Sequence, residues 1–252
     1  MLSGVAPYYI VNEFPRSGGT WLAKMLSEAL DVPFAQHSLP PPRAAILHGH
    51  FRAGWGLNNV VAMWRDGRDV LTSYYHYWMF RDSLSDAPMS GKVRADLGFA
   101  DSADVMTNMP AFIDYCFTRQ RYPRFSWSQF VDLWGTAPGV VHARYEALHT
   151  GTAAELARIV RDVTGTELAE DVAQQVAADF AFEKRAGRAA GQEDRESFMR
   201  KGIVGDWRNC FSREARVAFH GHAGDALITL GYEQDGGWVD APDDVSAASG
   251  AC

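Results

Sequence analysis

The chain has 252 residues, of which 47% are hydrophobic and 22% are charged, as is usual for a globular protein. This length suits one large domain or at most two small ones, and we expect one because no linker rich in Pro, Ser or Gly divides the chain. The net charge of -7 argues against a general nucleic-acid binder, which usually carries a basic face. It leaves room for a local basic pocket that binds a small anion.

Cellular location is indicated by the cysteines and by the hydropathy pattern. Cys116, Cys210 and Cys252 are widely spaced and fit a reducing compartment better than a disulfide framework. No basic-then-apolar leader opens the chain, and no run of about 18 apolar residues appears. We therefore expect a cytoplasmic protein without a membrane partner.

Strand and helix patterns alternate along the chain. The strand patterns cover residues 7–14, 44–50, 58–65 and 139–145. The helix patterns cover residues 18–30, 69–79, 109–120, 126–134, 151–163 and 167–180, and 213–232, where glycines interrupt the pattern. This alternation predicts an α/β fold, a three-layer α/β/α arrangement with a central parallel sheet covered on both faces. In such sheets, ligands bind at the carboxyl ends of the strands.

Two segments show no regular period. Residues 80–110 are mixed polar with Gly and Pro, and we expect a long loop that serves as a lid over an acceptor. The small and polar residues 236–252 are expected to form a loose tail. We therefore expect one domain over residues 1–235.

The stretch "EFPRSGGTWL" joins the first strand to the first helix and has the composition of a phosphate cradle. Gly18 and Gly19 allow a tight turn whose N–H groups point at an anion, and the helix dipole adds positive potential. Ser17 and Thr20 offer hydroxyls, and Arg16 adds a fixed charge. An ordinary strand-to-helix turn is the alternative. The stretch lacks the G-x-x-x-x-G-K-[ST] spacing of a triphosphate loop.

Two further motifs carry cations near a predicted turn. In "WRDGRDVLTSYYHYW", Arg65 and Ser73 lie eight positions apart, so both could reach one anion, whereas Arg68 and Asp69 suit structural salt links. In "FMRKGIVGDWRNCFS", Arg200 and Lys201 stand beside Gly202, which leaves a backbone N–H approachable. For Arg65 and Ser73, the alternative is a solvated arginine and an ordinary helix serine. For Arg200 and Lys201, the alternative is an exposed basic loop.

The three motifs together resemble those of the cytosolic sulfotransferases. "PRSGGTWL" is similar to the family's 5′-phosphosulfate loop, P-K-S-G-T-T-W, although Arg16 and Gly19 replace the usual lysine and threonine. The other two are similar to R-[ND]-x-[RK]-D-x-x-x-S-Y-Y and R-K-G-x-x-G-D-W, which bind the donor's 3′-phosphate. The motifs stand in the family's order, and the resemblance spans roughly Tyr8 to Tyr232.

The resemblance implies that the chain binds 3′-phosphoadenosine-5′-phosphosulfate (PAPS), the family's sulfuryl donor, and leaves the desulfated product PAP. The implied contacts are Arg16, Ser17, Gly18, Gly19 and Thr20 at the 5′-phosphosulfate; Trp21, Tyr145 and Phe182 at the adenine; and Arg65, Ser73, Arg200, Lys201 and Gly202 at the 3′-phosphate. Without the resemblance, each of these aromatic residues would more often be plain core.

"LHGHF" ends the second predicted strand and resembles the family's K-T-H, whose histidine is the catalytic base. That alignment selects His50, while His48 replaces the family's lysine. Because residues i and i+2 of a strand point the same way, either histidine could face the site, so His48 is a helper or a substitute. A histidine suits removal of the acceptor's proton, and Arg16 suits neutralisation of the departing phosphate.

A second "HGH" at residues 220–222 invites the alternative of a metal held by imidazole ligands. This pair lies in a predicted helix, where residues i and i+2 do not face each other. No carboxylate or cysteine stands at ligand spacing near either pair in the sequence. We therefore predict no metal.

Aromatic residues near the motifs predict the acceptor. We expect Phe51, His76 and Phe80 to contact it, and an aromatic wall suits a phenol or a hydrophobic alcohol. The leading hypothesis is a PAPS-dependent sulfotransferase acting on a hydroxyl of a small, aromatic or hydrophobic molecule. The rivals are a P-loop kinase or nucleotide triphosphatase, and a non-catalytic PAP-binding module. The oligomeric state is open.

Overall fold

The computed structural model describes residues 7–36, 43–52, 57–81, 87–195, 197 and 199–242. They group into two compact units. The first unit comprises Met1–Arg65 and Thr136–Gly187, and the second comprises Asp66–Gly135 and Arg188–Cys252. The chain therefore returns to its first unit after residue 135, and a single domain ending at residue 235 stays a prediction.

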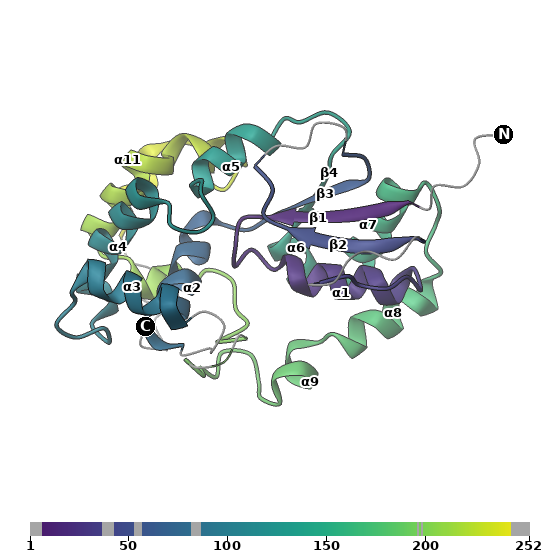
Figure 1. Cartoon of the computed structure of the whole chain (residues 1–252), viewed down its shortest axis with the longest axis horizontal. Helices are drawn as coiled ribbons and strands as arrows, with labels where there is room; N and C mark the ends of the chain where they lie inside the picture. Colours follow the sequence, from purple (N-terminus) through teal and green to yellow (C-terminus); the bar gives the residue numbers. More distant parts are fainter. Residues whose placement is uncertain are drawn as a thin grey trace. The chain divides into compact units, whose positions relative to one another are not determined.

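The first unit is built on a four-stranded sheet in the order β2-β1-β3-β4. Its strands, β1 (Tyr8–Glu13), β2 (Ala45–Gly49), β3 (Val60–Trp64) and β4 (Val141–Arg144), are all parallel and lie side by side in Figure 1. Every residue of β3 is buried, as expected for an apolar strand in the middle of a parallel sheet. The predicted strands and the α/β fold with a central parallel sheet are confirmed.

Helices of the first unit pack on this sheet through one shared core. They are α1 (Gly19–Ala29), α6 (Tyr145–Thr150), α7 (Thr152–Thr164) and α8 (Glu170–Asp179), whereas α9 (Phe182–Ala186) has no buried residue. The helix α1 forms because Leu22, Met25 and Leu26 recur at helical spacing, and these side chains are buried against Val11 and Ile46 of the sheet. The helices predicted at 18–30, 151–163 and 167–180 are confirmed. The short helices α6 and α9 escaped prediction because five or six residues show no reliable period.

Sheet topology determines where a ligand can approach. From β1 the chain passes to β2 on one side, and the next strand, β3, lies on the other side of β1. Ligands of open parallel sheets bind outside the carboxyl ends of the strands at such a reversal. Glu13 ends β1, His48 lies near the end of β2, and Arg65 follows β3, so the candidate loop and the first histidine pair share this edge.

The second unit is helical. Its elements are α2 (Gly67–Phe80), α3 (Ala87–Leu97), α4 (Val105–Arg119), α5 (Trp127–Trp134), α10 (Trp207–Cys210), α11 (Arg213–Thr229) and the 3-10 helix η1 (Gly236–Val239). Phe219 of α11 lies at the centre of an aromatic core, with its ring 5.8 Å from that of Phe117 and 6.0 Å from those of Trp127 and Phe211. The expected interruption of the last helix is confirmed at Ala223, whose φ of -148° is not helical.

Two expectations about irregular segments need correction. Residues 80–110 are not one long loop, because they contain α3 and the start of α4, while 82–86 lie outside the described residues. Among the described side chains of α3 only Ser90 and Val93 are buried, so its apolar period is too weak to read. In the expected tail, Trp238 and Val239 are buried within η1, and residues 243–252 lie outside the described part.

Cysteine chemistry also differs from the expectation. Cys116 carries a free thiol, and burial raises its pKa. Cys210 is disulfide-bonded, whereas the sequence favoured a reducing compartment over a disulfide framework. As for a membrane partner, none of the helices formed by the described residues has the length and apolar character to cross a bilayer.

Candidate active site

The candidate phosphate loop, residues 14–18, has an unusual backbone. Arg16 has φ 75° and Gly18 has φ 99°, so left-handed residues flank Ser17. Backbone of this kind forms anion-binding concavities, and a non-glycine residue with positive φ is uncommon outside functional sites. A Cβ atom at Gly18 would lie 2.8 Å from the ring of Tyr145. Both the φ angle and the close approach therefore require glycine at this position.

An aromatic and cationic cluster adjoins this loop. The rings of Trp21 and Tyr145 meet edge to face with centroids 5.8 Å apart, and the guanidinium carbon of Arg65 lies 4.3 Å from the centroid of Tyr145. Arg65 also donates from Nη1 to the carbonyl of Arg16 at 3.2 Å. The indole of Trp21 donates to the carbonyl of Phe180 at 3.2 Å. The fold thus brings together predicted residues from three separate segments.

The position of His50 is set by bonds to the backbone of its neighbour Phe51 and by its own bond to Glu13. The buried amide of Asn12 receives the N–H of Phe51 at 2.7 Å and donates to the carbonyl of Phe51 at 3.1 Å, which fastens the chain after β2 to β1. His50 Nδ1 lies 2.9 Å from the carbonyl oxygen of Glu13. Because that carbonyl can only accept, Nδ1 carries the hydrogen, and Nε2 of the neutral ring is the nitrogen that can accept a proton.

The side chain of Glu13 links the histidine pair to the candidate phosphate loop. Its Oε1 lies 2.8 Å from Nε2 of His48, and its Oε2 accepts the N–H of Gly19 at 2.5 Å. Burial alone would raise the pKa of Glu13, but the bond from His48, both histidine rings and the Gly19 N–H hold that pKa below its usual value. Glu13 is therefore a buried carboxylate, the kind of group that needs such partners.

Burial also controls the protonation of His50. Burial lowers the pKa of His50, and the nearby charge of Glu13 and the bond to its carbonyl offset part of this effect. The ring of His48 stands 5.3 Å from that of His50. His50 is therefore neutral near pH 7, as a proton acceptor must be.

Sequence reasoning missed Glu13. Glu13, His48 and His50 each offer one possible ligand atom, and these atoms all lie within 4.8 Å of one another. The expectation that no carboxylate lies near the first histidine pair is wrong for the folded chain. Glu13 contacts His48 although the two residues are 35 positions apart in the sequence. A charged residue at the end of an apolar strand was the available signal. Glu13 and His48 bond each other directly, and the absence of a metal stays a prediction.

The second histidine pair behaves as its helical position predicts. His222 bonds Asp114 at 2.8 Å and stacks on Phe117 with centroids 4.8 Å apart. His220 instead meets Trp238, with ring centroids 6.1 Å apart. The two rings thus have different neighbours and do not converge on one ion.

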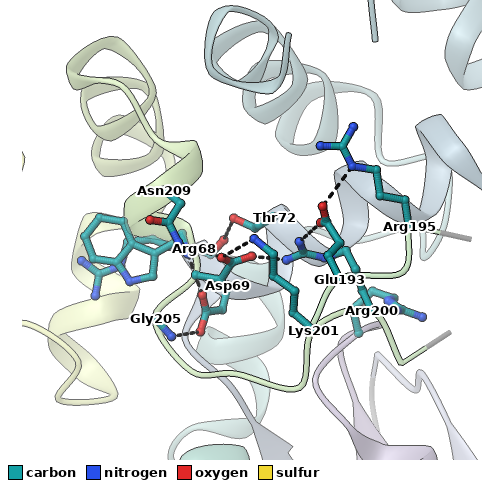
Figure 2. A network of polar contacts seen from close by, with 12 residues as sticks. Arg68, Asp69, Thr72, Glu193, Arg195, Arg200, Lys201, Gly205 and Asn209 are labelled. Carbon is teal, nitrogen blue, oxygen red and sulfur yellow. Dashed lines mark hydrogen bonds and ion pairs between the residues drawn. The ribbon is translucent and has the colours of Figure 1, made fainter. Parts of the chain in front are cut away.

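In the second unit, Asp69 holds the glycine-rich end of the third motif. Its Oδ2 accepts the N–H of Gly205 at 2.7 Å, and its Oδ1 accepts the N–H of Trp207 at 2.9 Å; Figure 2 shows the first of these contacts. These backbone bonds are the contacts observed for Asp69, for which a structural salt link was expected. A structural salt link is confirmed at Arg68, which pairs with Asp66 at 2.7 Å and Glu233 at 2.5 Å.

The cations of the third motif are buried and already paired. Lys201 Nζ lies 3.1 Å from Oδ1 of Asp206, Arg200 pairs with the other oxygen of Asp206, and Arg200 also bonds Glu193 at 2.5 Å. Figure 2 shows Arg200 and Lys201 converging on this network. Burial by itself would raise the pKa of Asp206, but these cations hold it below its usual value. An anion that binds here must add to the network or replace a carboxylate.

The remaining predicted residues divide between the units. Phe51 in the first unit has 41% of its surface exposed, and Phe182, which begins α9, is half-buried. In the second unit Ser73 is buried, and burial, together with the charge of Arg200, lowers the pKa of His76 to about 3. The ring of Phe80 lies 5.4 Å from that of His76. A neutral imidazole beside an aromatic ring suits an apolar ligand better than an anion.

The sulfotransferase domain family matches residues 56–231. Sulfotransferase 1A1 of Bos taurus is 23% identical over 262 residues, with 84% of this chain and 81% of that protein covered. Sulfotransferase 1B1 of Mus musculus is 21% identical over 247 residues, with coverage of 81% and 77%.

A similar fold is found among solved structures. The crystal structure of mouse sulfotransferase SULT7A1 complexed with PAP has a TM-score of 0.63 and 18% sequence identity, covering 92% of this chain and 86% of that one. The family match spans well over half of the chain and includes the second and third motifs. The chain therefore belongs to the sulfotransferase domain family and is a sulfotransferase.

Proposed function

We propose that this sulfotransferase moves a sulfuryl group from PAPS to a hydroxyl of a small aromatic or hydrophobic acceptor, with His50 as the base. The observation that carries the proposal is the bond from His50 Nδ1 to the carbonyl of Glu13. It selects the tautomer whose Nε2 accepts a proton, beside a loop with the backbone of an anion site. The PAP complex of the mouse neighbour supports the choice of donor.

The roles of the residues follow from the chemistry of displacement at sulfur. Bound PAPS supplies an activated sulfuryl group. His50 Nε2 takes the acceptor's hydroxyl proton while the acceptor oxygen bonds to sulfur and the bond between sulfur and the 5′-phosphate oxygen breaks. Arg16 and the backbone N–H groups of the loop stabilise the charge that grows on the departing phosphate of PAP. His48 assists as a neighbour of the base.

Donor contacts in the first unit have geometric support. The 5′-phosphosulfate is assigned to the loop with Arg16, Ser17, Gly18, Gly19 and Thr20, and the adenine to Trp21, Tyr145 and Phe182. Trp21 and Tyr145 already form one aromatic corner, closed by Arg65. The two aromatic rings suit contact with the adenine, and the guanidinium of Arg65 suits an adjacent phosphate.

The other contacts rest on the motifs. Ser73, Arg200, Lys201 and Gly202 are assigned to the 3′-phosphate because their motifs resemble those of the family. Arg200 and Lys201 share Asp206, so the buried network supplies donors with fixed positions. Phe51, His76 and Phe80 are proposed for the acceptor, since Phe51 is exposed next to the base and His76 is neutral.

The proposal is tested by incubating the protein with PAPS and a panel of phenols and sterols. Mass spectrometry should detect a sulfated product, with PAP formed in equal amount. If PAPS does not bind and no PAP forms, the proposal fails. A protein that binds PAP yet forms no product with any acceptor would instead be a binding module.

The kinase alternative is separated by thermal unfolding. A ligand that binds only the folded state raises the melting temperature, and at equal concentration a tighter ligand raises it more. PAP should raise it and ATP should not, because the loop carries no G-K-[ST] to reach a γ-phosphate. A larger shift with ATP than with PAP would favour the kinase or triphosphatase.

A further inference from the structure

Three residues of the first unit depend on one another at the edge of the sheet. Glu13 ends β1, Gly19 begins α1 and His48 lies on β2. A Cβ atom at Gly19 would lie 2.6 Å from the carboxyl carbon of Glu13. The carboxylate therefore occupies the space of any side chain at residue 19, and its two oxygens reach Gly19 N–H and His48.

Two departures from the family pattern are explained by this carboxylate. Gly19 stands where the family usually has threonine, and His48 stands where it has lysine. In this chain Glu13 contacts both positions, so the glycine makes room for the carboxylate and the histidine bonds it. The three residues form one arrangement, which we name the Glu13 bridge.

We propose that Glu13 is a positioning residue for sulfuryl transfer, because it holds the histidine pair in register with the start of the phosphate-loop helix. This inference rests on the proposed function and concerns a residue that no motif includes. Glu13 acts on both histidines by different atoms: its carbonyl orients His50, and its carboxylate holds His48. A base oriented by a third group is a general design of sites that activate a hydroxyl.

The bridge is also electrostatic. A buried carboxylate requires compensation, which Gly19 N–H, the amino end of α1 and the histidines provide. Among the described residues, the charge of Glu13 raises the pKa of His50 and that of His48 lowers it. The two neighbours therefore influence the base in opposite directions.

These opposite influences define the test. Glu13→Gln removes the negative charge, so the pKa of His50 should fall and the acidic limb of kcat/KM for PAPS should move to lower pH. His48→Gln keeps a donor toward Glu13 but removes the imidazole that lowers the pKa of His50, so the same limb should move to higher pH. Glu13→Gln should also lower kcat on the order of tenfold, since a weaker and less constrained base transfers protons more slowly.

Control variants separate positioning from general structure. Glu13→Asp keeps the charge, so its pH profile should stay closer to wild type than that of Glu13→Gln. His142→Gln changes another strand histidine, one that is exposed and accepts a bond from the indole of Trp64 at 2.8 Å. That variant should leave the pH profile unchanged. All variants should first be shown to be folded by circular dichroism.

A second readout needs no turnover. NMR titration of the His50 ring in the ligand-free protein should show its pKa lowered in Glu13→Gln and raised in His48→Gln. Failure of the proposed function therefore remains distinguishable from failure of this inference. Unchanged His50 titrations in both Glu13→Gln and His48→Gln would overturn it. So would one zinc ion bound per purified chain and lost in Glu13→Gln, because the three groups would then be metal ligands.

Discussion

At the scale of single residues, the backbone carbonyl of Glu13 decides what His50 can do. The carbonyl orients the ring and leaves Nε2 as the basic nitrogen. Burial makes His50 a weaker base than an exposed histidine, and Glu13 restores part of that basicity. The side chain thus stays neutral near pH 7, as the proposed proton transfer requires.

The pH dependence of turnover follows from this environment. A histidine base works only when it is neutral, and the pKa of His50 is lowered from the ordinary histidine value of about 6.5. The acidic limb of kcat/KM for PAPS, which reports the free enzyme, should therefore fall below that value. A limb at or above it would show that another group is the base.

Gly18 offers a residue-scale test of the loop. Gly18→Ala should destabilise the protein and weaken PAP binding, because alanine must adopt φ 99° and its Cβ would meet Tyr145 at 2.8 Å. Positive φ alone costs on the order of 1–3 kcal/mol. Gly165→Ala is the matched control, since Gly165 has φ 73° and nothing within 4 Å of an added Cβ. Denaturant unfolding should show a larger loss for Gly18→Ala, and equal losses would contradict the predicted contact.

At the scale of elements, the carboxyl edge of the sheet assembles the site of the first unit. The parallel register places Asn12 opposite Gly49 and Glu13 opposite Met63, so the ends of β1, β2 and β3 coincide. In the second unit, Asp69 of α2 holds the turn before α10 by two backbone bonds. Each motif is therefore anchored to a regular element rather than left on a free loop.

The anchoring by Asp69 has a measurable value. Asp69→Asn keeps one acceptor oxygen but puts an amide NH₂ against a backbone N–H. Leaving a buried donor unsatisfied costs about 1–3 kcal/mol, and the free energy of unfolding should fall by that amount. Asp114→Asn, which alters an exposed side-chain bond to His222, should change it by less than about 0.5 kcal/mol. Equal effects in the two variants would contradict the anchoring role.

At the scale of the whole molecule, sequence reasoning succeeds where a strong local pattern exists. Apolar strands and the glycines of the loop are visible in single segments, so the sheet, α1 and the loop could be predicted. The helix α3 was missed because few of its side chains are buried. Glu13 was missed because its partners Gly19 and His48 meet it only in the folded sheet. A contact between residues 35 positions apart produces no residue periodicity that could be recognised in a single sequence.

A paired measurement on wild type and His50→Ala tests whether His50 removes the acceptor's proton within a site that binds PAPS. Wild type and His50→Ala are compared for PAP affinity by calorimetry and for PAP release from PAPS with an acceptor that wild type sulfates. The variant should bind PAP like wild type and release it about 10²- to 10⁴-fold more slowly, the usual value of a general base. Release at the wild-type rate by His50→Ala would contradict the account.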